Sequence, residues 1–330
     1  MTILITGCAG FIGYSVAKEL LKMGDTVIGV DNFNTSYRID IKHQRNGRLG
    51  VYNKHIYSYQ GSHNKYKCVF ADTTNRSKME QIFTGNNIKM VIHLAARAGV
   101  RESVSNPDEY VNSNIIGFYN IMECCRKYKV KKVIYASSSS VYGNNKKLPF
   151  SENDKIGTPL SIYAASKISN ELMAHTYSHL HGIQTIGLRF FTVYGPWGRP
   201  DMAIWKFTHA IMKEKPIKVY NYGDMSRSFT YIDDIASAVR NIVLSSNLDQ
   251  YEIINLGNNV GDTLGTLIGI LEDKIGKSAI IEHIEMQPGD VKEILADIKK
   301  AKKKLNWMPC LDLDDGLERF VDWYKEYIYE

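Results

Sequence analysis

The stretch Gly7-Cys8-Ala9-Gly10-Phe11-Ile12-Gly13 decides the fold of this chain. It follows a short apolar run, Thr2–Thr6, and it opens a segment with the apolar spacing of a helix. Glycines at such a junction permit a tight turn and let backbone N–H groups approach a pyrophosphate at the N-terminus of the helix. The sequence therefore predicts a strand, a glycine turn and a helix that together bind a dinucleotide.

A carboxylate follows at the end of the next apolar run. Asp31 ends the strand expected at Thr26–Val30 and lies 18 positions after Gly13. A carboxylate in this place can accept hydrogen bonds from the 2′- and 3′-hydroxyls of the adenosine ribose, and it would repel a 2′-phosphate. We therefore expect NAD rather than NADP as the cofactor, with further polar contacts from Asn32 and Ser36.

Apolar runs alternate with helical patterns through the first two-thirds of the chain. Such alternation, with continuous apolar strands, predicts an α/β fold with a doubly wound parallel sheet. Helices are expected after Gly10, Asn75, Asn112 and Tyr163, and Gly24 is placed to end the first of them. The expected strands are Thr2–Thr6, Thr26–Val30, Lys67–Ala71, Met90–Leu94, Lys132–Ser137 and Thr185–Arg189.

The pattern changes at two places. Residues 43–66 are polar and aromatic, and we interpret them as an insertion, in part helical, between the second and third strands. After about Pro196 the alternation weakens. We expect residues 1–195 to form the NAD-binding domain and residues 196–330 a smaller α/β lobe that binds the substrate. A late stretch, Glu252–Leu256, could rejoin the main sheet. The helices expected in the lobe are Met202–Lys213, Asp233–Ser245, Thr263–Ile275 and Leu313–Tyr329.

The composition excludes several classes of protein. The 330 residues are 44% hydrophobic and 23% charged, as in ordinary globular domains. No apolar run approaches the ~20 residues of a membrane span, and the N-terminus lacks the basic region of a signal peptide. The formal charge of +6 comes without a basic stripe between aromatics, so nucleic acid is not an expected partner. We expect a cytoplasmic protein without a metal, and reduced thiols at Cys8, Cys68, Cys124, Cys125 and Cys310.

Two further motifs carry acid–base chemistry. Tyr163 and Lys167 are four positions apart and share one face of a helix. A nearby ammonium and the positive nicotinamide ring of NAD+ lower the pKa of a phenol from its usual ~10, so that it can act as a general base. Ser138, Ser139 and Ser140 end a predicted strand, and in a parallel sheet that end is where ligands bind.

These motifs together resemble the extended short-chain dehydrogenase/reductase family, specifically its members that act on nucleotide sugars. The resemblance covers essentially the whole chain and implies a Rossmann-type fold, NAD that stays bound through the catalytic cycle, and a homodimer that pairs the helices after Asn112 and Tyr163. It also implies that Ser138 is the hydroxyl partner of Tyr163. The matching residues are the glycine spacing, Asp31, His93–Ala96, Ser138, Tyr163 and Lys167.

The resemblance implies a cofactor site along the edge of the sheet. Lys167 bonds the nicotinamide ribose, Asp72 and Thr73 match the position beside the adenine, and Leu94 to Ala96 line the cofactor. The full set of expected cofactor-binding residues is Gly7, Gly10, Phe11, Ile12, Gly13, Asp31, Asn32, Ser36, Asp72, Thr73, Leu94, Ala95, Ala96, Tyr163, Lys167, Phe190 and Val193.

The serines bear on the reaction. The related 4-epimerases, 4,6-dehydratases and UDP-glucuronate decarboxylases all begin by oxidising C4 of the sugar. Dehydratases carry Asp-Glu where this chain has Ser139-Ser140, and decarboxylases typically carry Glu at the position of Ser140. With serine at both places no acid–base group is supplied there, so the ketone can only be reduced again. The resemblance therefore implies a 4-epimerase that works by transient hydride transfer to bound NAD+ through a 4-keto intermediate.

The second half of the chain bears on the sugar. Residues 188–202 resemble the UDP-glucuronate 4-epimerases, as do residues 98–101, 220–223, 229–234 and 287–290. We therefore expect UDP-glucuronate as the substrate and UDP-galacturonate as the product. Neutral donors can bind a carboxylate through hydrogen bonds, and an arginine can add charge. The expected substrate-binding residues are Ser138, Ser139, Ser140, Thr192 and Arg101 for the sugar, and Arg199, Val219, Tyr220, Arg227 and Asp290 for the nucleotide.

Alternative functions stay open. Glu102-Ser103-Val104 is similar to the UDP-glucose 4-epimerases, and Arg97 lies where uronate epimerases often carry other residues. A 4-epimerase of UDP-glucose or UDP-N-acetylglucosamine is therefore the nearest alternative. A UDP-glucuronate decarboxylase is disfavoured by Ser140. A non-catalytic NAD-sensing protein of the same fold usually lacks the Tyr163–Lys167 pair.

Overall fold

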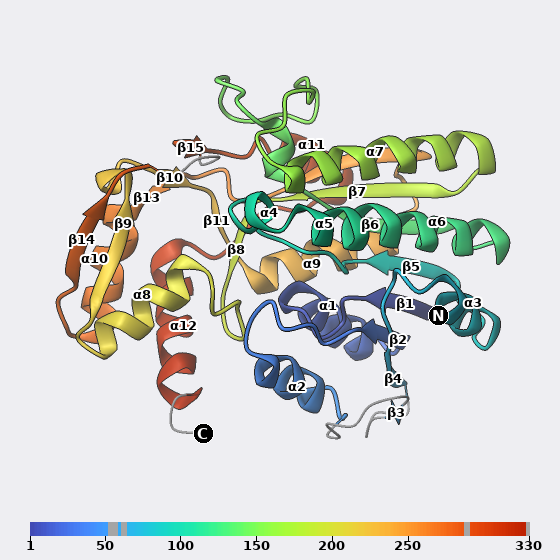
Figure 1. Cartoon of the computed structure of the whole chain (residues 1–330), viewed down its shortest axis with the longest axis horizontal. Coiled ribbons are helices and arrows are strands. Elements are labelled where there is room, and N and C mark those ends of the chain that lie inside the picture. The colour runs from blue at the N-terminus through green and yellow to red at the C-terminus, as the bar shows by residue number, and fades with distance from the viewer. Residues whose placement is uncertain (52–58, 61–64, 287–290, 328–330) are drawn as a thin grey trace.

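A computed structural model describes residues 1–51, 59–60, 65–286 and 291–327 (Figure 1). Its centre is an eight-stranded sheet with the order β12-β7-β6-β5-β1-β2-β4-β3. All neighbouring strands in it are parallel except β3, which pairs antiparallel with β4 at the edge. The predicted parallel sheet is thus confirmed. The strands are β1 (Thr2–Thr6), β2 (Thr26–Asp31), β3 (Tyr59–Gln60), β4 (Tyr66–Phe70), β5 (Met90–His93), β6 (Lys132–Ser138), β7 (Gln184–Phe190) and β12 (Tyr251–Leu256).

Helices cover both faces of this sheet, which is why its strands are apolar throughout rather than alternating. Ile3 and Ile5 of β1 face the core beneath α1, α9 and α11, while Leu4 faces the core beneath α3, α6 and α7. All three side chains are fully buried. The helices are α1 (Phe11–Lys22), α9 (Ile232–Leu244) and α11 (Lys299–Leu305) on one face, and α3 (Arg76–Thr84), α6 (Gly117–Lys127) and α7 (Ile162–His181) on the other.

Local signals set the ends of these helices. Asn75 caps α3, because its side chain accepts a hydrogen bond from the N–H of Lys78 at 3.0 Å. Ser161 caps α7 in the same way through the N–H of Ala164, so this helix begins one residue before Tyr163. Gly24 follows the last residues of α1 with a φ of +84°, a left-handed conformation that favours glycine.

Two segments differ from the expected pattern. The polar region after β2 contains α2 (Ile39–Arg48), which begins before residue 43, and β3; residues 52–58 and 61–64 of the expected insertion lie outside the described residues. The helix expected after Asn112 is the end of a longer helical run. That run comprises α4 (Glu102–Ser105), α5 (Pro107–Tyr110), the π-helical turn η1 (Val111–Ile116) and α6.

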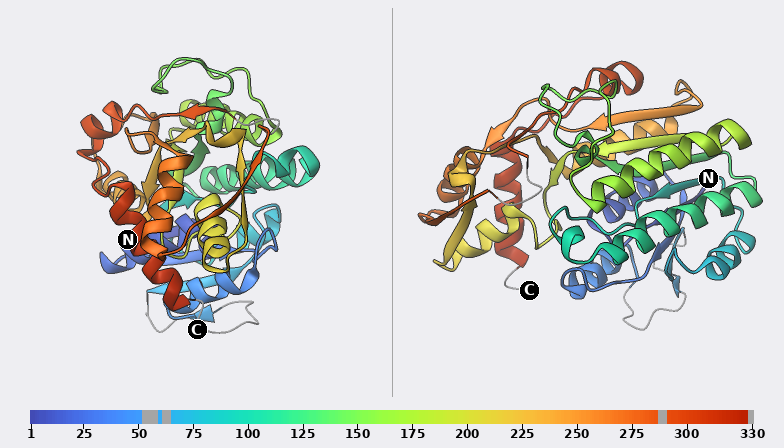
Figure 2. Two further views of the ribbon diagram at one scale, coloured as in Figure 1. Left: turned by 90° about the vertical axis from the view of Figure 1, so that its left-hand side faces the viewer. Right: turned by 45° about the horizontal axis from the view of Figure 1, so that its top comes forward.

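Most of the chain after residue 196 forms a smaller lobe at the carboxyl ends of the sheet strands (Figures 1 and 2). Its core joins three helices to short strands, and β12 leaves the lobe to lie beside β7 in the main sheet. The lobe helices are α8 (Ala203–Met212), α10 (Leu264–Ile275) and α12 (Leu313–Tyr327). The remaining elements are η2 (Ser139–Tyr142), β8 (Thr192–Tyr194), β9 (Pro216–Tyr220), η3 (Asn221–Gly223), β10 (Ser226–Arg227), β11 (Phe229–Tyr231), β13 (Asp262–Thr263), β14 (Ile280–Ile284) and β15 (Glu293–Ile294).

The described helices include none with both the length and the apolar content to cross a bilayer. The five cysteines are unpaired, and Cys8, Cys68, Cys124 and Cys125 are buried.

Candidate active site

A cavity of about 1060 Å³ lies between the carboxyl edge of the sheet and the lobe. Because all strands that meet at this edge are parallel, their C-terminal ends and the loops that follow them converge there. The cavity is lined from one side by the glycine turn and the ends of the sheet strands, and from the other by β8, α8, β9 and β10. We call these two sides the cofactor half and the substrate half.

The glycine turn forms a cradle that admits no side chain. Gly7 has a φ of +72°, and a Cβ atom on it would lie 2.7 Å from the backbone nitrogen of Ala95. A Cβ atom on Gly13 would lie 2.0 Å from the carbonyl oxygen of Gly7. Glycine is therefore required at position 7 by the close approach of the segment after β5, and at position 13 by the close approach of α1 to the turn. The turn, with Gly7, Gly10, Phe11, Ile12 and Gly13 all lining the cavity, fits the pyrophosphate of a dinucleotide.

The N-terminus of α1 is open toward this cradle. Gly10 caps it without a side-chain hydrogen bond, and the first turn carries no acidic residue. The first N–H groups of a helix lack intrahelical partners and carry partial positive charge. This end of α1 can therefore bind an anion, in agreement with the shape of the turn.

Asp31 lies at the far end of the cofactor half. It is buried, and its two carboxylate oxygens accept hydrogen bonds from the N–H groups of Phe33 at 2.8 Å and Ala9 at 3.1 Å. These contacts fix the carboxylate beside the glycine turn while each oxygen keeps further acceptor capacity. Asn32 donates to Asp72 at 2.6 Å, so the side chains expected around the adenosine are linked to one another.

Ser36 and Thr73 also line the cavity at this end. The hydroxyl of Ser36 donates to Asn34 at 2.8 Å and accepts a hydrogen bond from Arg97 at 2.6 Å. Leu94, Ala95 and Ala96 continue the lining toward the centre of the cavity. The backbone of Leu94 to Ala96 is fixed to the neighbouring strand β1, because the N–H of Ala95 donates to Thr6 Oγ1 at 3.2 Å.

Lys167 and Tyr163 occupy the centre of the cavity, on adjacent turns of α7. The ammonium of Lys167 donates to the carbonyl oxygen of Ala136 at 2.9 Å and lies 5.8 Å from the centre of the Tyr163 ring. Burial lowers the pKa of Lys167 to about 8. The lysine side chain is thus anchored to β6 while its ammonium lines the cavity.

Opposing influences act on the pKa of Tyr163. Burial is the largest influence on the phenol and raises its pKa above the ordinary value, while a hydrogen bond with Ser138 and the charge of Arg199 lower it. Among the protein's own groups, desolvation of the phenolate outweighs the lowering, and the expected lowering of the pKa by the ammonium together with the positive ring of NAD+ stays a prediction. A phenolate at neutral pH needs more positive charge than these side chains provide.

The three serines lie where β6 ends. Ser138 caps the short helix η2, and its hydroxyl oxygen accepts hydrogen bonds from the N–H of Ser140 at 3.2 Å and from the Ser140 hydroxyl at 2.9 Å. Ser139 lines the cavity beside them. The carboxyl end of β6 thus offers hydroxyl groups, and no carboxylate, next to Tyr163.

The substrate half brings long side chains from separate elements to the cavity. Arg199 donates to the carbonyl oxygen of Ala98 at 3.0 Å and pairs with Asp201 at 2.6 Å. The guanidinium of Arg101 lies over the ring of Tyr220, 4.1 Å from its centre. The other predicted residues that line the cavity are Thr192, Arg227, Phe190 and Val193.

Of the predicted residues that the structure describes, one is not among those that line the cavity. Val219 is buried in the core of the lobe, because side chains alternate along β9 and the two on either side of it, Lys218 and Tyr220, face the cavity. Because the Val219 side chain points into this core, a contact of this residue with the nucleotide would come from its backbone, and its assignment stays a prediction. Asp290 lies outside the described residues, and its assignment stays a prediction.

The structure adds lining residues that the sequence did not suggest. Lys42 of α2 is buried, and its ammonium donates to the carbonyl oxygen and the side-chain oxygen of Asn34 at 2.8 and 2.9 Å. Tyr37 lines the cavity beside it, and Lys206 and Lys218 do so in the lobe. The sequence pattern that could have pointed to α2 is the spacing of Ile41 and Arg45, which are four positions apart and share one face of a helix.

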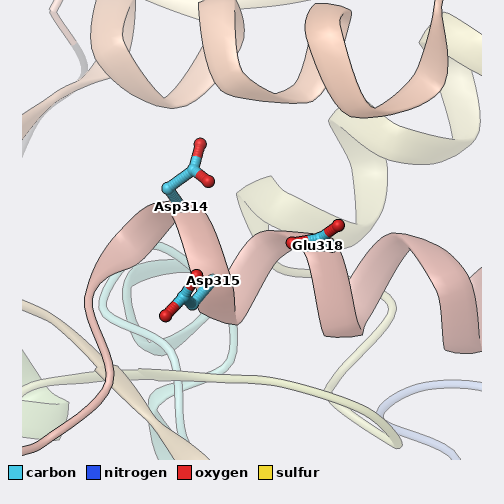
Figure 3. Close-up of side chains that lie close together, drawn as sticks. All are labelled: Asp314, Asp315 and Glu318. Carbon is cyan, nitrogen blue, oxygen red and sulfur yellow. The ribbon is translucent and has the colours of Figure 1, made fainter.

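A cluster of carboxylates lies elsewhere. Asp314, Asp315 and Glu318 of α12 lie close enough together to share a cation (Figure 3). All three are exposed, and Lys274 pairs with Asp314 at 2.7 Å and with Glu318 at 3.7 Å. None of the three lines the cavity. The cluster is therefore a partly neutralised surface and no part of the candidate site.

Known proteins share this fold and sequence over nearly the full chain. Residues 3–257 match the NAD dependent epimerase/dehydratase family. Relatives include Protein CapI of Staphylococcus aureus, 46% identical with 99% of each chain covered, and a UDP-glucuronate 4-epimerase of Thermodesulfobacterium geofontis, 46% identical with 98% of this chain and 96% of that one covered. The crystal structure of a UDP-glucuronic acid 4-epimerase from Bacillus cereus, in complex with UDP-glucuronic acid and NAD, covers 99% of this chain and 100% of its own at 34% identity and a TM-score of 0.89.

Proposed function

Because this chain belongs to the NAD dependent epimerase/dehydratase family, we propose that it is a 4-epimerase that interconverts UDP-glucuronate and UDP-galacturonate. The observation that carries the proposal is the centre of the cavity, where Tyr163 and Lys167 meet a strand end of three serines. A base is available for the 4-hydroxyl of the sugar, and Ser139 and Ser140 offer no second base beside it.

Different residues of this chain have different roles in the proposed reaction. The glycine turn, Asp31 and Lys167 would hold NAD, which when bound supplies the hydride acceptor for C4 and gives the hydride back. Tyr163 accepts the proton of the 4-hydroxyl and returns it when the ketone is reduced. Ser138 donates a hydrogen bond to the reacting oxygen. Since burial raises the pKa of Tyr163, the positive ring of NAD+ is needed beside the phenol to make it a base near neutral pH.

Neutral donors suit the carboxylate of a uronate. A uronate oxidised at C4 is a β-keto acid that loses CO2 readily, so an epimerase must hold the carboxylate away from the geometry of decarboxylation. Ser139, Ser140 and Thr192 line the cavity and can bind both oxygens through hydrogen bonds. A Ser139→Ala/Thr192→Ala double variant is expected to lose its preference for UDP-glucuronate over UDP-glucose, measured as the ratio of kcat/KM values. An unchanged ratio would exclude this assignment.

The nucleotide would be held by the substrate half. Arg199 and Arg227 provide charge for the pyrophosphate, and Tyr220, stacked on Arg101, offers an aromatic face near the base. In this arrangement residues 1–195 serve chiefly as the NAD-binding domain and residues 196–330 chiefly as the nucleotide-sugar-binding lobe.

We further propose a homodimer through α6 and α7. Large apolar side chains on these packed helices are exposed, among them Tyr119 on the first and Leu172 and Leu180 on the second, and Ile116 at the end of η1 is exposed directly before α6. Leu172 exposes 65% of its surface. A second copy that pairs the same helices would cover them. Light scattering should give the mass of a dimer for the wild type and that of a monomer for Leu172→Glu.

The cytoplasm is the proposed location, since four buried, unpaired thiols suit a reducing compartment.

One observation favours a second candidate sugar. Glu102 lines the cavity and would repel a uronate, although Arg97 lies 3.9 Å from its carboxylate. UDP-glucose has no such charge, and the structure of a UDP-glucose 4-epimerase from Thermotoga maritima, solved with UDP-glucose, has a TM-score of 0.87 to this chain at 29% identity.

Product analysis by NMR tests the proposal. Purified protein is incubated with UDP-glucuronate and no added cofactor, and the anomeric signal of UDP-galacturonate is expected. UDP-xylose or a 4-keto-pentose would mean decarboxylation instead. If UDP-glucuronate stays unchanged while UDP-glucose or UDP-N-acetylglucosamine is converted, the reaction holds and the uronate assignment fails.

A further inference from the structure

Helix α2 carries an arginine that is buried completely. Arg45 has no exposed surface, and its guanidinium makes five hydrogen bonds to neutral oxygens. Nε and Nη2 donate to the carbonyl oxygen of Trp197 at 3.0 and 2.7 Å, and Nη2 also donates to that of Gly198 at 3.0 Å. Nη1 donates to the carbonyl oxygen of Ala9 at 3.0 Å and to the hydroxyl of Tyr37 at 2.7 Å.

The carbonyl acceptors of Arg45 belong to two different segments of the chain. Ala9 lies inside the glycine turn of the cofactor half. Trp197 and Gly198 belong to the loop that leads from β8 to Arg199, which we call the substrate loop (residues 195–199). One guanidinium therefore joins the backbone of the cofactor cradle to the backbone of the substrate loop. Its planar array of five donors suits this task, because it can address several fixed carbonyls at once.

The substrate loop needs such support. Trp197 has a φ of +64°, a left-handed conformation that is rare for a bulky side chain and persists only where its surroundings enforce it. The carbonyl groups of Trp197 and of Gly198, which follows it, both accept hydrogen bonds from Arg45. The ring of Trp197 is held as well, with the guanidinium of Arg48 4.4 Å from its centre and Trp323 5.2 Å away. The next side chain after this turn, Arg199, lines the cavity.

A second buried arginine shows what a purely structural role looks like. Arg189 forms an ion pair with Glu171 at 2.8 Å, and both side chains lie deep between β7 and α7. Its charge is matched by a carboxylate, and its bonds reach neither the glycine turn nor the substrate loop. Arg45 instead places its charge among carbonyl groups of the glycine turn and the substrate loop, and so contacts both segments at once.

We propose that Arg45 is a positioning residue that couples the two halves of the cavity, so that retention of NAD and affinity for the nucleotide sugar both depend on it. The inference rests on the proposed function, because it takes the two halves as sites for NAD and a UDP-sugar. Arg45 touches neither ligand; it acts through the glycine turn on one side and through Arg199 on the other.

Arg45→Lys tests the proposal, since lysine keeps the charge but carries its donors on a single nitrogen, which cannot reach the glycine turn and the substrate loop from three separate positions as the guanidinium does. NAD retained after gel filtration, the Kd of NAD by calorimetry, and kcat and KM for UDP-glucuronate at saturating NAD+ are measured. We expect the Kd of NAD and the KM each to rise about tenfold or more, with kcat within about threefold, because small displacements of binding groups weaken ligand contacts steeply. Arg45→Gln serves as the second variant if the lysine variant does not fold.

Ile82→Ala is the matched control, because it opens the core beneath α3 and touches neither segment. It should lower the melting temperature and leave both affinities unchanged. If Arg45→Lys lowers the melting temperature as the control does and leaves the Kd and the KM at wild-type values, the role of Arg45 is structural and the proposal is wrong. A change in only one of the two affinities would also overturn it, since the coupling requires both.

A double variant tests the route through Arg199. In the background of Arg199→Met, Arg45→Lys should raise the KM by less than about twofold further, whereas fully additive effects would exclude this route. Failure of the proposed function remains distinguishable. A wild type that converts UDP-glucose but not UDP-glucuronate shifts the KM measurement to that sugar, and the calorimetry with NAD does not depend on the sugar at all.

Discussion

The cofactor half and the substrate half of the cavity are built in different ways. The cofactor half consists of backbone and short side chains that follow the ends of neighbouring strands, with Gly7 and Gly13 at places where a Cβ atom would collide with backbone. The substrate half consists of long side chains, such as Arg199 and Arg227, that come from separate elements of the lobe. A cradle of backbone groups loses its whole binding geometry when one residue collides with it, whereas removal of one long side chain removes only the contacts of that side chain. Substitutions should therefore act abruptly in the first half and gradually in the second.

The largest effect is expected where the two halves meet. Tyr163→Phe removes the base for the 4-hydroxyl, and kcat should fall about 10³-fold, as is typical when a general base is lost. The phenol is no part of the glycine cradle, so the amount of NAD retained should equal that of the wild type. Steady-state kinetics and the NAD content of the purified protein check both statements. A variant that has lost its NAD would show that the boundary between the halves is drawn in the wrong place.

The sequence predicts the cofactor half well because that half is local. Gly7 to Gly13, Asp31 and the serines at the end of β6 each lie at the end of a strand or directly after it, so the position of the strand end fixes the position of the residue. The parallel order of the strands then brings these ends to one edge of the sheet, and all of the predicted cofactor residues line the cavity.

The sequence predicts less where position depends on distant contacts. Lys42 reaches the cavity only because α2 packs against the glycine turn and the substrate loop, and the backbone partners of Arg45 lie 36, 152 and 153 residues away. Val219 was expected in the cavity, yet the alternation of side chains along β9 turns it inward. The sequence pattern also does not show that burial raises the pKa of Tyr163 in the protein without its cofactor.

Gly13→Ala tests the expectation that a substitution in the cofactor half has an abrupt effect on binding. The added methyl group would lie 2.0 Å from the carbonyl oxygen of Gly7, so the turn must open and the cradle is lost. We expect the Kd of NAD to rise at least about 100-fold, because the backbone N–H groups no longer converge on the pyrophosphate. Gly269→Ala is the control, since a Cβ atom there meets nothing within 4 Å. A Gly13→Ala protein that binds NAD normally would contradict the cradle.

Arg227→Met tests the expectation that a substitution in the substrate half has a gradual effect on binding. Loss of one charged hydrogen-bond donor to a pyrophosphate costs about 1.5–3 kcal/mol, so the KM for the UDP-sugar should rise about 10- to 100-fold. kcat should stay within about threefold, because the reacting C4 lies at the other end of the substrate. Arg227→Lys should fall between the variant and the wild type, since a point charge replaces part of the interaction. If the methionine variant also loses NAD, the two halves are not separable at this residue.

The smallest effect concerns Lys167, the one long cation at the centre of the cofactor half, and it is an effect on stability. Its pKa is lowered from 10.5 to about 8 in the folded, NAD-free protein. Between these two pH values Lys167 is protonated in the unfolded chain and neutral in the folded protein. Below pH 8 it is charged in both states, and the folded protein then bears the full destabilisation from the buried ammonium. This destabilisation disappears as the pH rises toward 10.5. Lys167→Met should therefore be more stable than the wild type by about 2 kcal/mol at pH 7, at about 1.4 kcal/mol per unit of pKa less the lost bond to Ala136. Urea unfolding of both proteins at pH 7 and pH 9.5 measures the difference, which should shrink at the higher pH. A difference in the free energy of unfolding that does not change with pH would contradict this prediction, because it would mean that burial of the Lys167 ammonium does not destabilise the folded protein.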